Sequence, residues 1–431
     1  MDSPFSTDSE HIAELRRRMP ERGLFADKEW LTSPSAFPLS KEQVDYLEKL
    51  GPRLLAFLKA CNLFYGQSRK GKLPAYIHEW LDAGKPVDLL NLANNPALKN
   101  ELPQVIRPDL LITDKGFALS EIDSIPGGIG LTAWLNESYA ALGQDVIGGA
   151  HGMKEAAQRL LGDGEVVIAE EGLTYRPEFE WLFGAERVKA AESYFFGEKK
   201  VYRFFEAFDW PALTSIRQSY DVSKVMTPPL KPFLEEKLWL ALYWLKPLRE
   251  AWRRELGDRY DRDFQDLIPY SWVLNPEALP PTAVLPQLNA HSWSEVAAFS
   301  QKERDLIVKI SGFSDQAWGS RGVSLGSDMS TVEWKEKIEQ ALAGFTKSPF
   351  IMQRYEKPAL VQHSVWDEQR REIQMRSWRV RLCPYYFVED EEAKLKGVLA
   401  TLCPADKKLI HGMKDAVIIP CCREQGGRVA V

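Results

Sequence analysis

The residues best suited to chemistry lie in the segment 107–130, where three carboxylates recur at short spacing. Asp109 is followed by Glu121 and Asp123, and Asp114-Lys115-Gly116 separates two short runs rich in Leu and Ile. This pattern predicts a β-hairpin. The period of two along a strand puts Glu121 and Asp123 on one face, with Asp109 opposite them on the partner strand. Like charges this close repel unless a cation lies among them, and Mg²⁺ suits such hard oxygen ligands. An exposed acidic hairpin is the alternative interpretation.

Two flanking features strengthen the metal-site interpretation. Arg107 precedes Asp109 by one intervening residue, and Pro126-Gly127 follows the carboxylates. The order Arg-X-Asp, hairpin, Glu-X-Asp, Pro-Gly resembles the metal-binding strands of the ATP-grasp ligases, glutathionylspermidine synthase among them. Asp123 departs from the family, which more often has Asn there, although Asp is an adequate oxygen ligand. The resemblance implies that Asp109, Glu121 and Asp123 bind Mg²⁺. It also implies that Arg107 stabilises an acyl phosphate or the departing phosphate.

The hairpin comes early in the chain, whereas most ATP-grasp enzymes have it near the end of the ATP-binding domain. The resemblance is therefore to the circularly permuted members, whose nucleotide-binding half lies downstream. The expected fold is mixed, α+β or α/β: a permuted ATP-grasp core, a small Rossmann-like domain and N-terminal helices. The expected domains are 1–140 with helices and the metal-binding hairpin, 141–230 as the Rossmann-like substrate domain, and 231–431 as the nucleotide-binding lobes.

Strands and helices alternate between about residues 140 and 230. Short apolar runs predict three strands, at 165–169, 187–191 and 200–205. Their order predicts a parallel sheet, which resembles the small domain that precedes the ATP-binding lobes in ATP-grasp enzymes. Such sheets bind ligands at the carboxyl ends of their strands, so Glu170, Glu171 and Tyr175 are candidate substrate contacts. Ordinary exposed polar residues are the alternative.

A long helix is predicted over 231–255, with an aliphatic face that includes Leu238 and Leu242. Lys237 within it stands where the family has a lysine that reaches the nucleotide phosphates. A solvated lysine on a helix that packs in the core is the alternative.

Lys309 ends a predicted strand that starts at Leu306, and a loop rich in glycine and serine follows. A lysine beside such a loop supplies a positive charge and backbone N–H donors around phosphates. The family has the same pattern, which implies nucleotide contacts from four residues of the loop: Gly319, Ser320, Arg321 and Gly322. The loop is longer than usual here, so its register on ATP is open, and a loop that only connects strands is the alternative.

The strand predicted at 349–355 resembles the family's hinge, which pairs with the adenine edge. The resemblance implies adenine contacts from Gln353, with Met352 beside the base and Tyr355 just beyond it. A longer strand at 374–387 places Arg379 and Arg381 on one face. Their planar guanidinium groups suit phosphate or an acyl phosphate, whereas a charged edge strand is the alternative.

The function implied is an ATP- and Mg²⁺-dependent carboxylate–amine ligase that acts through an acyl phosphate on a small-molecule carboxylate and amine. A kinase or ATPase of the same fold, or a non-catalytic nucleotide-binding protein, are the alternatives. A Ser-His-Asp hydrolase is poorly supported.

Composition bounds the remaining possibilities. With 431 residues, the chain is expected to form two or three packed units. Its net charge of −6 argues against a nucleic-acid or membrane-surface partner, which would select a basic surface. There is no run of about 18 apolar residues and no signal peptide, so a cytoplasmic location is expected. The five cysteines form no CxxC pair, which argues against a disulfide framework. Oligomeric state is open.

Overall fold

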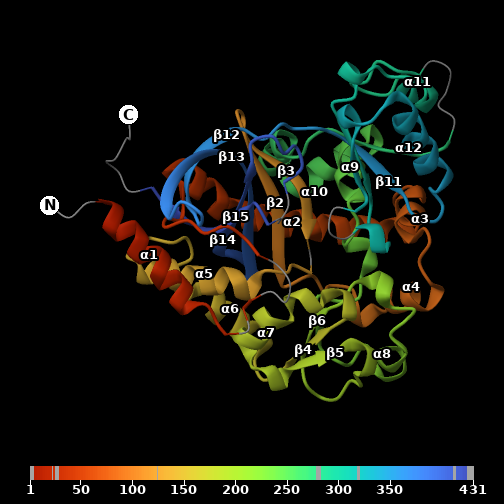
Figure 1. The fold of residues 1–431 in the computed structure, drawn as a ribbon. Coiled ribbons are helices and arrows are strands. Elements are labelled where there is room, and N and C mark those ends of the chain that lie inside the picture. The colour runs from red at the N-terminus through yellow and green to blue at the C-terminus, as the bar shows by residue number, and fades with distance from the viewer. Residues whose placement is uncertain are drawn as a thin grey trace. The chain divides into compact units, whose positions relative to one another are not determined.

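The computed structural model describes residues 4–21, 23–24, 29–123, 125–277, 283–317, 321–410 and 414–424. The chain forms two compact units (Figure 1). Unit 1 comprises residues 1–55, 101–229 and 357–431, and unit 2 comprises residues 56–100 and 230–356. The three domains expected from the sequence remain a prediction.

A large sheet dominates unit 1. In the described part of the chain it has seven strands in the order β1-β15-β14-β13-β2-β3, with β12 also paired to β13. The bounds are β1 Phe37–Leu39, β2 Val105–Thr113, β3 Gly116–Asp123, β12 Leu360–Asp367, β13 Glu372–Glu389, β14 Glu392–Pro404 and β15 Val417–Arg423. All pairings are antiparallel except that of β1 with β15. Helices α5 (Ile129–Ala141) and α6 (Gly152–Leu161) pack against β14.

Unit 1 also contains a four-stranded parallel sheet, counted over the described residues, in the order β5-β4-β6-β7. Its strands are β4 Glu165–Ile168, β5 Val188–Ala190, β6 Val201–Phe204 and β7 Met226–Thr227. Helix α7 (Arg176–Phe183) connects β4 to β5, and α8 (Thr214–Ser219) lies between β6 and β7 in sequence. The strand–helix order therefore predicted the parallel sheet correctly.

Unit 2 is built on a four-stranded antiparallel sheet, again counted over the described residues, in the order β10-β9-β11-β8. The strands are β8 Ser271–Val273, β9 Leu306–Ile310, β10 Val323–Leu325 and β11 Phe350–Arg354. One face packs in a core with α11 (Trp293–Ala297) and α12 (Thr331–Ala343), centred on the buried Trp334. Helix α9 (Leu238–Trp244) contacts β8 and β11. Helices α3 (Tyr76–Asp82) and α4 (Val87–Ala93) also belong to this unit.

The single helix expected over 231–255 is wrong. The structure has a 3₁₀ turn at Pro232–Leu234, then α9, a second 3₁₀ turn at Lys246–Leu248, and α10 (Arg249–Leu267). Leu245 is extended (φ −63°, ψ 119°), and Pro247 in the following turn cannot donate a helical hydrogen bond. The aliphatic periodicity was real, but proline ended the helix.

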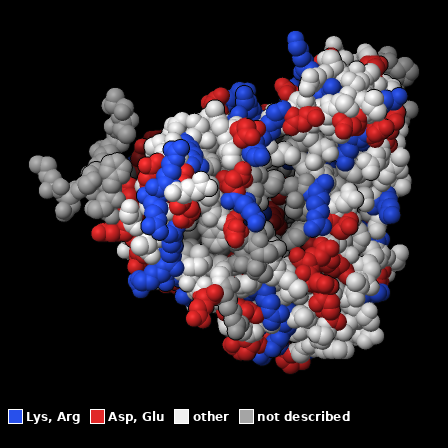
Figure 2. Space-filling model, in the orientation of Figure 1, with Lys and Arg blue, Asp and Glu red and all other residues white. Residues whose placement is uncertain are grey.

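The N-terminal region is helical as expected, with α1 (Pro4–Arg18) and α2 (Lys41–Arg69), apart from the short strand β1. Within the described ranges, no helix has the length and apolar character needed to cross a bilayer. On the face in Figure 2, basic and acidic side chains occur side by side over much of the surface. The absence of nucleic-acid and membrane partners remains a prediction.

Candidate functional site

The predicted hairpin forms with the expected register in unit 1. Strands β2 and β3 pair antiparallel, which places Arg107 opposite Asp123 and Asp109 opposite Glu121. The register shifts between Asp109 and Leu110, where a bulge interrupts the ladder. The four chemically distinctive residues of the hairpin are thus cross-strand neighbours, as the alternation implied.

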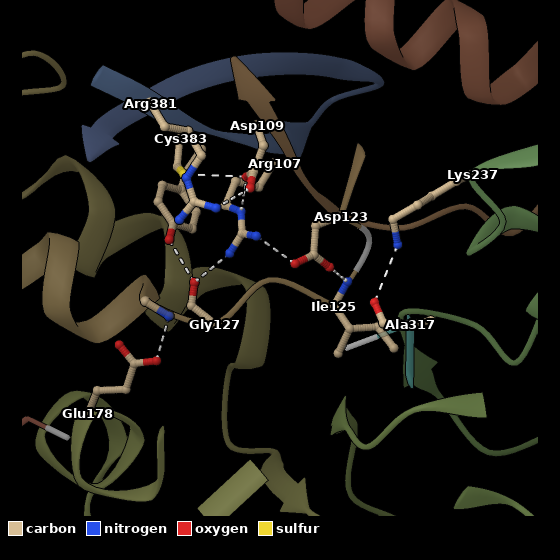
Figure 3. A network of polar contacts seen from close by, with 12 residues as sticks. Arg107, Asp109, Asp123, Ile125, Gly127, Glu178, Lys237, Ala317, Arg381 and Cys383 are labelled. Carbon is tan, nitrogen blue, oxygen red and sulfur yellow. Dashed lines mark hydrogen bonds and ion pairs between the residues drawn. The ribbon is translucent and has the colours of Figure 1, made fainter. Parts of the chain in front are cut away.

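Arg107 lies between the two aspartates (Figure 3). Its Nε donates to Asp109 Oδ1 at 3.1 Å, and its Nη2 lies 2.8 Å from Asp123 Oδ2. Its Nη1 donates to the Gly127 carbonyl oxygen at 3.1 Å. The guanidinium group therefore supplies, in this structure, a positive charge among the carboxylates.

The neighbouring strand β13 contributes a second arginine. Arg381 Nη1 donates to Asp109 Oδ2 at 2.8 Å, and Cys383 Sγ lies 3.3 Å from Asp109 Oδ1. The side chain of Asp109 is 1 % exposed. Burial alone would raise the pKa of Asp109, but the charges of Arg107 and Arg381 lower it below its ordinary value. Burial and the adjacent Asp109 carboxylate raise the pKa of Cys383 to about 12, so this thiol stays protonated.

The turn after the hairpin is held by two side chains that sequence reasoning missed. Tyr385 Oη donates to the Gly127 carbonyl oxygen at 2.7 Å. The buried carboxylate of Glu178 accepts from the backbone N–H groups of Gly128 and Leu131, at 2.7 and 2.8 Å, at the start of α5. Strand alternation from Arg381 could have found Tyr385, which lies on the same face of β13. No sequence signal pointed to Glu178.

The metal ligands assigned from the resemblance have different environments. Asp109 is enclosed by arginines, whereas the Asp123 side chain is 29 % exposed and Glu121 is partly exposed. Burial raises the pKa of Asp123, with Arg107 opposing that effect. Within the described residues, no group of three or more His, Cys, Asp or Glu is arranged to hold a metal ion. Glu121 and Asp123 still fit Mg²⁺, which needs only one or two carboxylates besides water and phosphate oxygens. The assignment of all three carboxylates remains a prediction.

The two arginines on β13 differ in their contacts. Arg379 Nε donates to the Ala405 carbonyl oxygen at 2.8 Å, and its Nη1 donates to that of Pro358. Arg381 keeps a buried Nε for which the described residues provide no hydrogen-bond partner. Strand β13 pairs with β14 on one side and with β2 and β12 on the other, so the edge-strand alternative is wrong.

In unit 2, the strand lysine and the hinge glutamine meet on one face of the sheet. Lys309 Nζ donates to Gln353 Oε1 at 2.9 Å, and Gln353 Nε2 donates to Ser271 Oγ at 3.1 Å. All three residues are buried. Met352 belongs to the core with Trp334. Tyr355 follows β11, and its backbone N–H donates to the Asp305 carbonyl oxygen at 3.1 Å.

Lys237 stands directly before α9 and extends to the loop that follows β9. Its Nζ lies 3.5 Å from the Ala317 carbonyl oxygen (Figure 3). Arg321 is exposed and Gly322 is buried beside Ile310. The predicted phosphate contacts Gly319 and Ser320 lie outside the described residues.

The candidate substrate contacts follow β4 as predicted. Glu170, Glu171 and Tyr175 lie in the 3₁₀ segment Glu170–Tyr175 directly after that strand. The Tyr175 ring packs on Gly127, where a Cβ atom would come within 2.5 Å of it. Glu192, which follows β5, accepts from the Glu170 backbone N–H at 2.8 Å. These residues therefore gather at the carboxyl edge of the parallel sheet.

Comparison with known proteins identifies the class of fold. No family model and no curated protein sequence matches this chain. A solved structure of a glutathione synthetase-like effector from Globodera pallida, in its apo form, matches over 96% of this chain and 97% of that one, with a TM-score of 0.54 and 10% identity. A protein from Methylobacillus flagellatus KT with the provisional name gamma-glutamylcysteine synthetase matches over 88% of each chain, with a TM-score of 0.40 and 11% identity. The chain thus shares a mixed α+β fold with a glutathione synthetase-like protein.

Proposed function

We propose that this protein is an ATP- and Mg²⁺-dependent carboxylate–amine ligase with a circularly permuted ATP-grasp fold. The observation that carries the proposal is the hairpin, in which Arg107, Asp109, Glu121 and Asp123 are cross-strand neighbours. Their residue types and order resemble the metal-binding strands of ATP-grasp ligases. The fold shared with a glutathione synthetase-like protein supports the same class.

The proposal assigns the nucleotide to residues of unit 2. Lys237 and Lys309 would neutralise phosphate charge, and the loop from Gly312 to Gly322 would add backbone N–H donors. Gln353 would mark the adenine hinge, with Met352 and Tyr355 beside it. Lys309 is 5% exposed, and phosphate is a suitable partner for a cation held in such a low-dielectric place.

Glu121 and Asp123, together with Asp109 opposite Glu121 on the partner strand, would hold Mg²⁺. When bound, the ion neutralises charge on the terminal phosphates. The arginines would have separate tasks: Arg107 fixes both aspartates, and the free Nε of Arg381 donates to an anionic oxygen. Arg379 would support the loops whose carbonyl groups it binds, rather than contact phosphate directly.

The proposed reaction forms an amide through an acyl phosphate. A substrate carboxylate oxygen attacks the γ-phosphorus of ATP, the bond to the bridging oxygen breaks, and ADP leaves. An amine then attacks the carbonyl carbon of the acyl phosphate, loses a proton, and expels inorganic phosphate. Positioning and charge stabilisation account for most of the catalysis in phosphoryl transfer, so the protein needs no covalent nucleophile.

The test is ADP release from Mg·ATP in the presence of a library of small carboxylates and amines, with products identified by mass spectrometry. We expect Asp123→Ala to lower turnover by about 10²-fold or more, because it removes a carboxylate that would hold Mg²⁺ at the phosphates. Asp114→Ala, at the exposed turn of the same hairpin, is the matched control and should retain turnover.

Three outcomes would contradict the proposal. Retained ligation in Asp123→Ala removes the metal assignment. ADP formation without a joined product indicates a kinase or ATPase of the same fold. Binding of ATP without any turnover across the library indicates a non-catalytic nucleotide-binding protein.

A further inference from the structure

Unit 2 contains an ion pair withdrawn from water. Lys85 Nζ donates to Glu236 Oε1, and the side chains are 0% and 1% exposed. Lys85 lies between α3 and α4, and Glu236 directly precedes Lys237 at the start of α9. Removing two charges from water costs about as much as their attraction returns, so stability alone gives little reason for a buried pair.

The remaining contacts of Glu236 connect two elements that the proposed nucleotide site uses. Ser311 Oγ donates to Glu236 Oε2, and the Phe313 backbone N–H donates to Oε1 at 3.3 Å. Ser311 Oγ also accepts from the Leu238 backbone N–H at 2.8 Å. The Lys237 backbone N–H donates to the Ser311 carbonyl oxygen at 2.9 Å. These bonds join the end of β9 to the start of α9.

The loop that follows β9 is shaped to receive this carboxylate. A Cβ atom on Gly312 would lie 2.6 to 2.8 Å from the carboxyl group of Glu236, so a side chain at this position would displace it. Lys85 Nζ lies 5.4 Å from the centroid of the Phe313 ring, within the range of a cation–π contact. The first residues of the loop thus contact both members of the pair: Gly312 and the Phe313 backbone contact Glu236, and the Phe313 ring contacts Lys85.

We infer that the Lys85–Glu236 pair is a positioning device that fixes Lys237 and the loop beginning at Gly312 for phosphate binding. The inference rests on the proposed function, because it is about the nucleotide site. Glu236 binds Ser311 and the Phe313 backbone at the start of the loop, and the adjacent Lys237 reaches the Ala317 carbonyl oxygen within the loop. An unpaired carboxylate beside Lys237 would repel phosphate, and Lys85 cancels that charge.

Binding of the Mg²⁺ complex of AMP-PNP, measured by isothermal titration calorimetry, tests the inference. We expect Lys85→Met to weaken binding by about tenfold or more, because Lys237 and the loop N–H groups would be displaced from the phosphates and would contribute less to binding. Lys231→Met is the matched control. Lys231 is also a buried lysine of unit 2, but its Nζ bonds Asn62 Oδ1 and the Lys99 carbonyl oxygen, away from the loop.

A double-mutant cycle distinguishes a role of Lys85 in positioning Lys237 from a general loss of stability in the variant. If Lys85 acts through Lys237 as well as through the loop, Lys85→Met should weaken binding less in a Lys237→Ala background than in the wild type, since coupled sites are not additive. An undiminished effect in that background would overturn the inference. So would Lys85→Met and Lys231→Met weakening binding equally. If Lys85→Met does not fold, Ser311→Ala tests the same link without removing a charge.

Hydrogen exchange in the nucleotide-free protein tests the positioning role of the pair without depending on the proposed function. Amides in residues 311–317 should exchange faster in Lys85→Met and in Glu236→Gln than in the wild type, and at the wild-type rate in Lys231→Met. If the wild type binds no AMP-PNP, the proposed function fails while exchange still decides the positioning role. Unchanged exchange in both variants would overturn the inference whether or not nucleotide binds.

Discussion

Asp109, which the sequence predicted to be a metal ligand, has a structural role as the counter-charge of two arginines. Its two oxygens accept from Arg107 and Arg381, and its side chain is almost fully buried. Sequence spacing correctly predicted that the two aspartates lie close together, since Arg107 contacts both Asp109 and Asp123. Spacing could not reveal that Arg381, encoded far downstream, would be the second cation on Asp109.

Asp109→Asn should destabilise unit 1 by about 3–5 kcal/mol, because it removes a buried carboxylate that is the shared counter-charge of two partly buried guanidinium groups. Asp123→Asn is the matched control: its side chain is 29 % exposed and forms an ion pair with Arg107 at 2.8 Å, so a loss of about 1 kcal/mol is expected. Urea unfolding measures both values. Equal losses for the two variants would mean that the arginines do not depend on Asp109.

Helices and strands were predicted correctly where the local sequence pattern contained no residue that opposes it. The hairpin of β2 and β3 and the parallel order of β4, β5 and β6 follow from alternation and turn residues. The long helix expected over 231–255 failed because Pro247 outweighed a correct aliphatic periodicity. Periodicity reports which face is buried, whereas proline and backbone angles decide where the helix stops.

The connection between α5 and α6 provides a test of packing between elements. Gly148 has φ +88°, and a Cβ atom there would lie 1.8 Å from the Lys396 carbonyl oxygen on β14. The adjacent Gly149 has φ +74° with no atom within 4 Å of its Cβ position. An L residue at either position would therefore have an unfavourable left-handed backbone, but only a side chain at position 148 would also clash with β14.

Gly149→Ala should cost about 1–2 kcal/mol, the penalty of a left-handed backbone for an L residue. Gly148→Ala should cost at least about 2 kcal/mol more, because the strand carbonyl blocks the new methyl group. Chemical denaturation of the two variants compares them directly. Similar losses would mean that the connection can move away from β14 at little cost.

At the scale of the whole molecule, the chain passes from one unit to the other after residues 55, 100, 229 and 356. Each unit is thus assembled from separated segments. In unit 2, Phe57 and Phe64 from the first segment pack on the fully buried Trp252 of the second, with ring centroids 5.0 and 4.7 Å away. Tyr65 stacks on Phe233 at 3.7 Å in the same way.

A fragment of residues 230–356 should therefore not fold cooperatively, because it exposes the apolar surface around Trp252 and Phe233. Joining residues 56–100 to it through a flexible linker should restore a cooperative thermal transition. Circular dichroism and tryptophan fluorescence follow both proteins. A sharp transition in the shorter fragment would show that the first segment is dispensable for this unit.

The sequence by itself determined the local facts: the hairpin and its facing carboxylates, the parallel sheet, and the lysine one residue before the end of β9. These depend on periods of two and on turn residues, which act over a few positions. Only the tertiary structure decided that Arg381 lies on Asp109, that Glu178 holds the turn at Gly127, and that Lys85 neutralises Glu236. The partners in these pairs are between about 50 and 270 positions apart in the chain, and burial of charge selects them only once the strands and helices have packed.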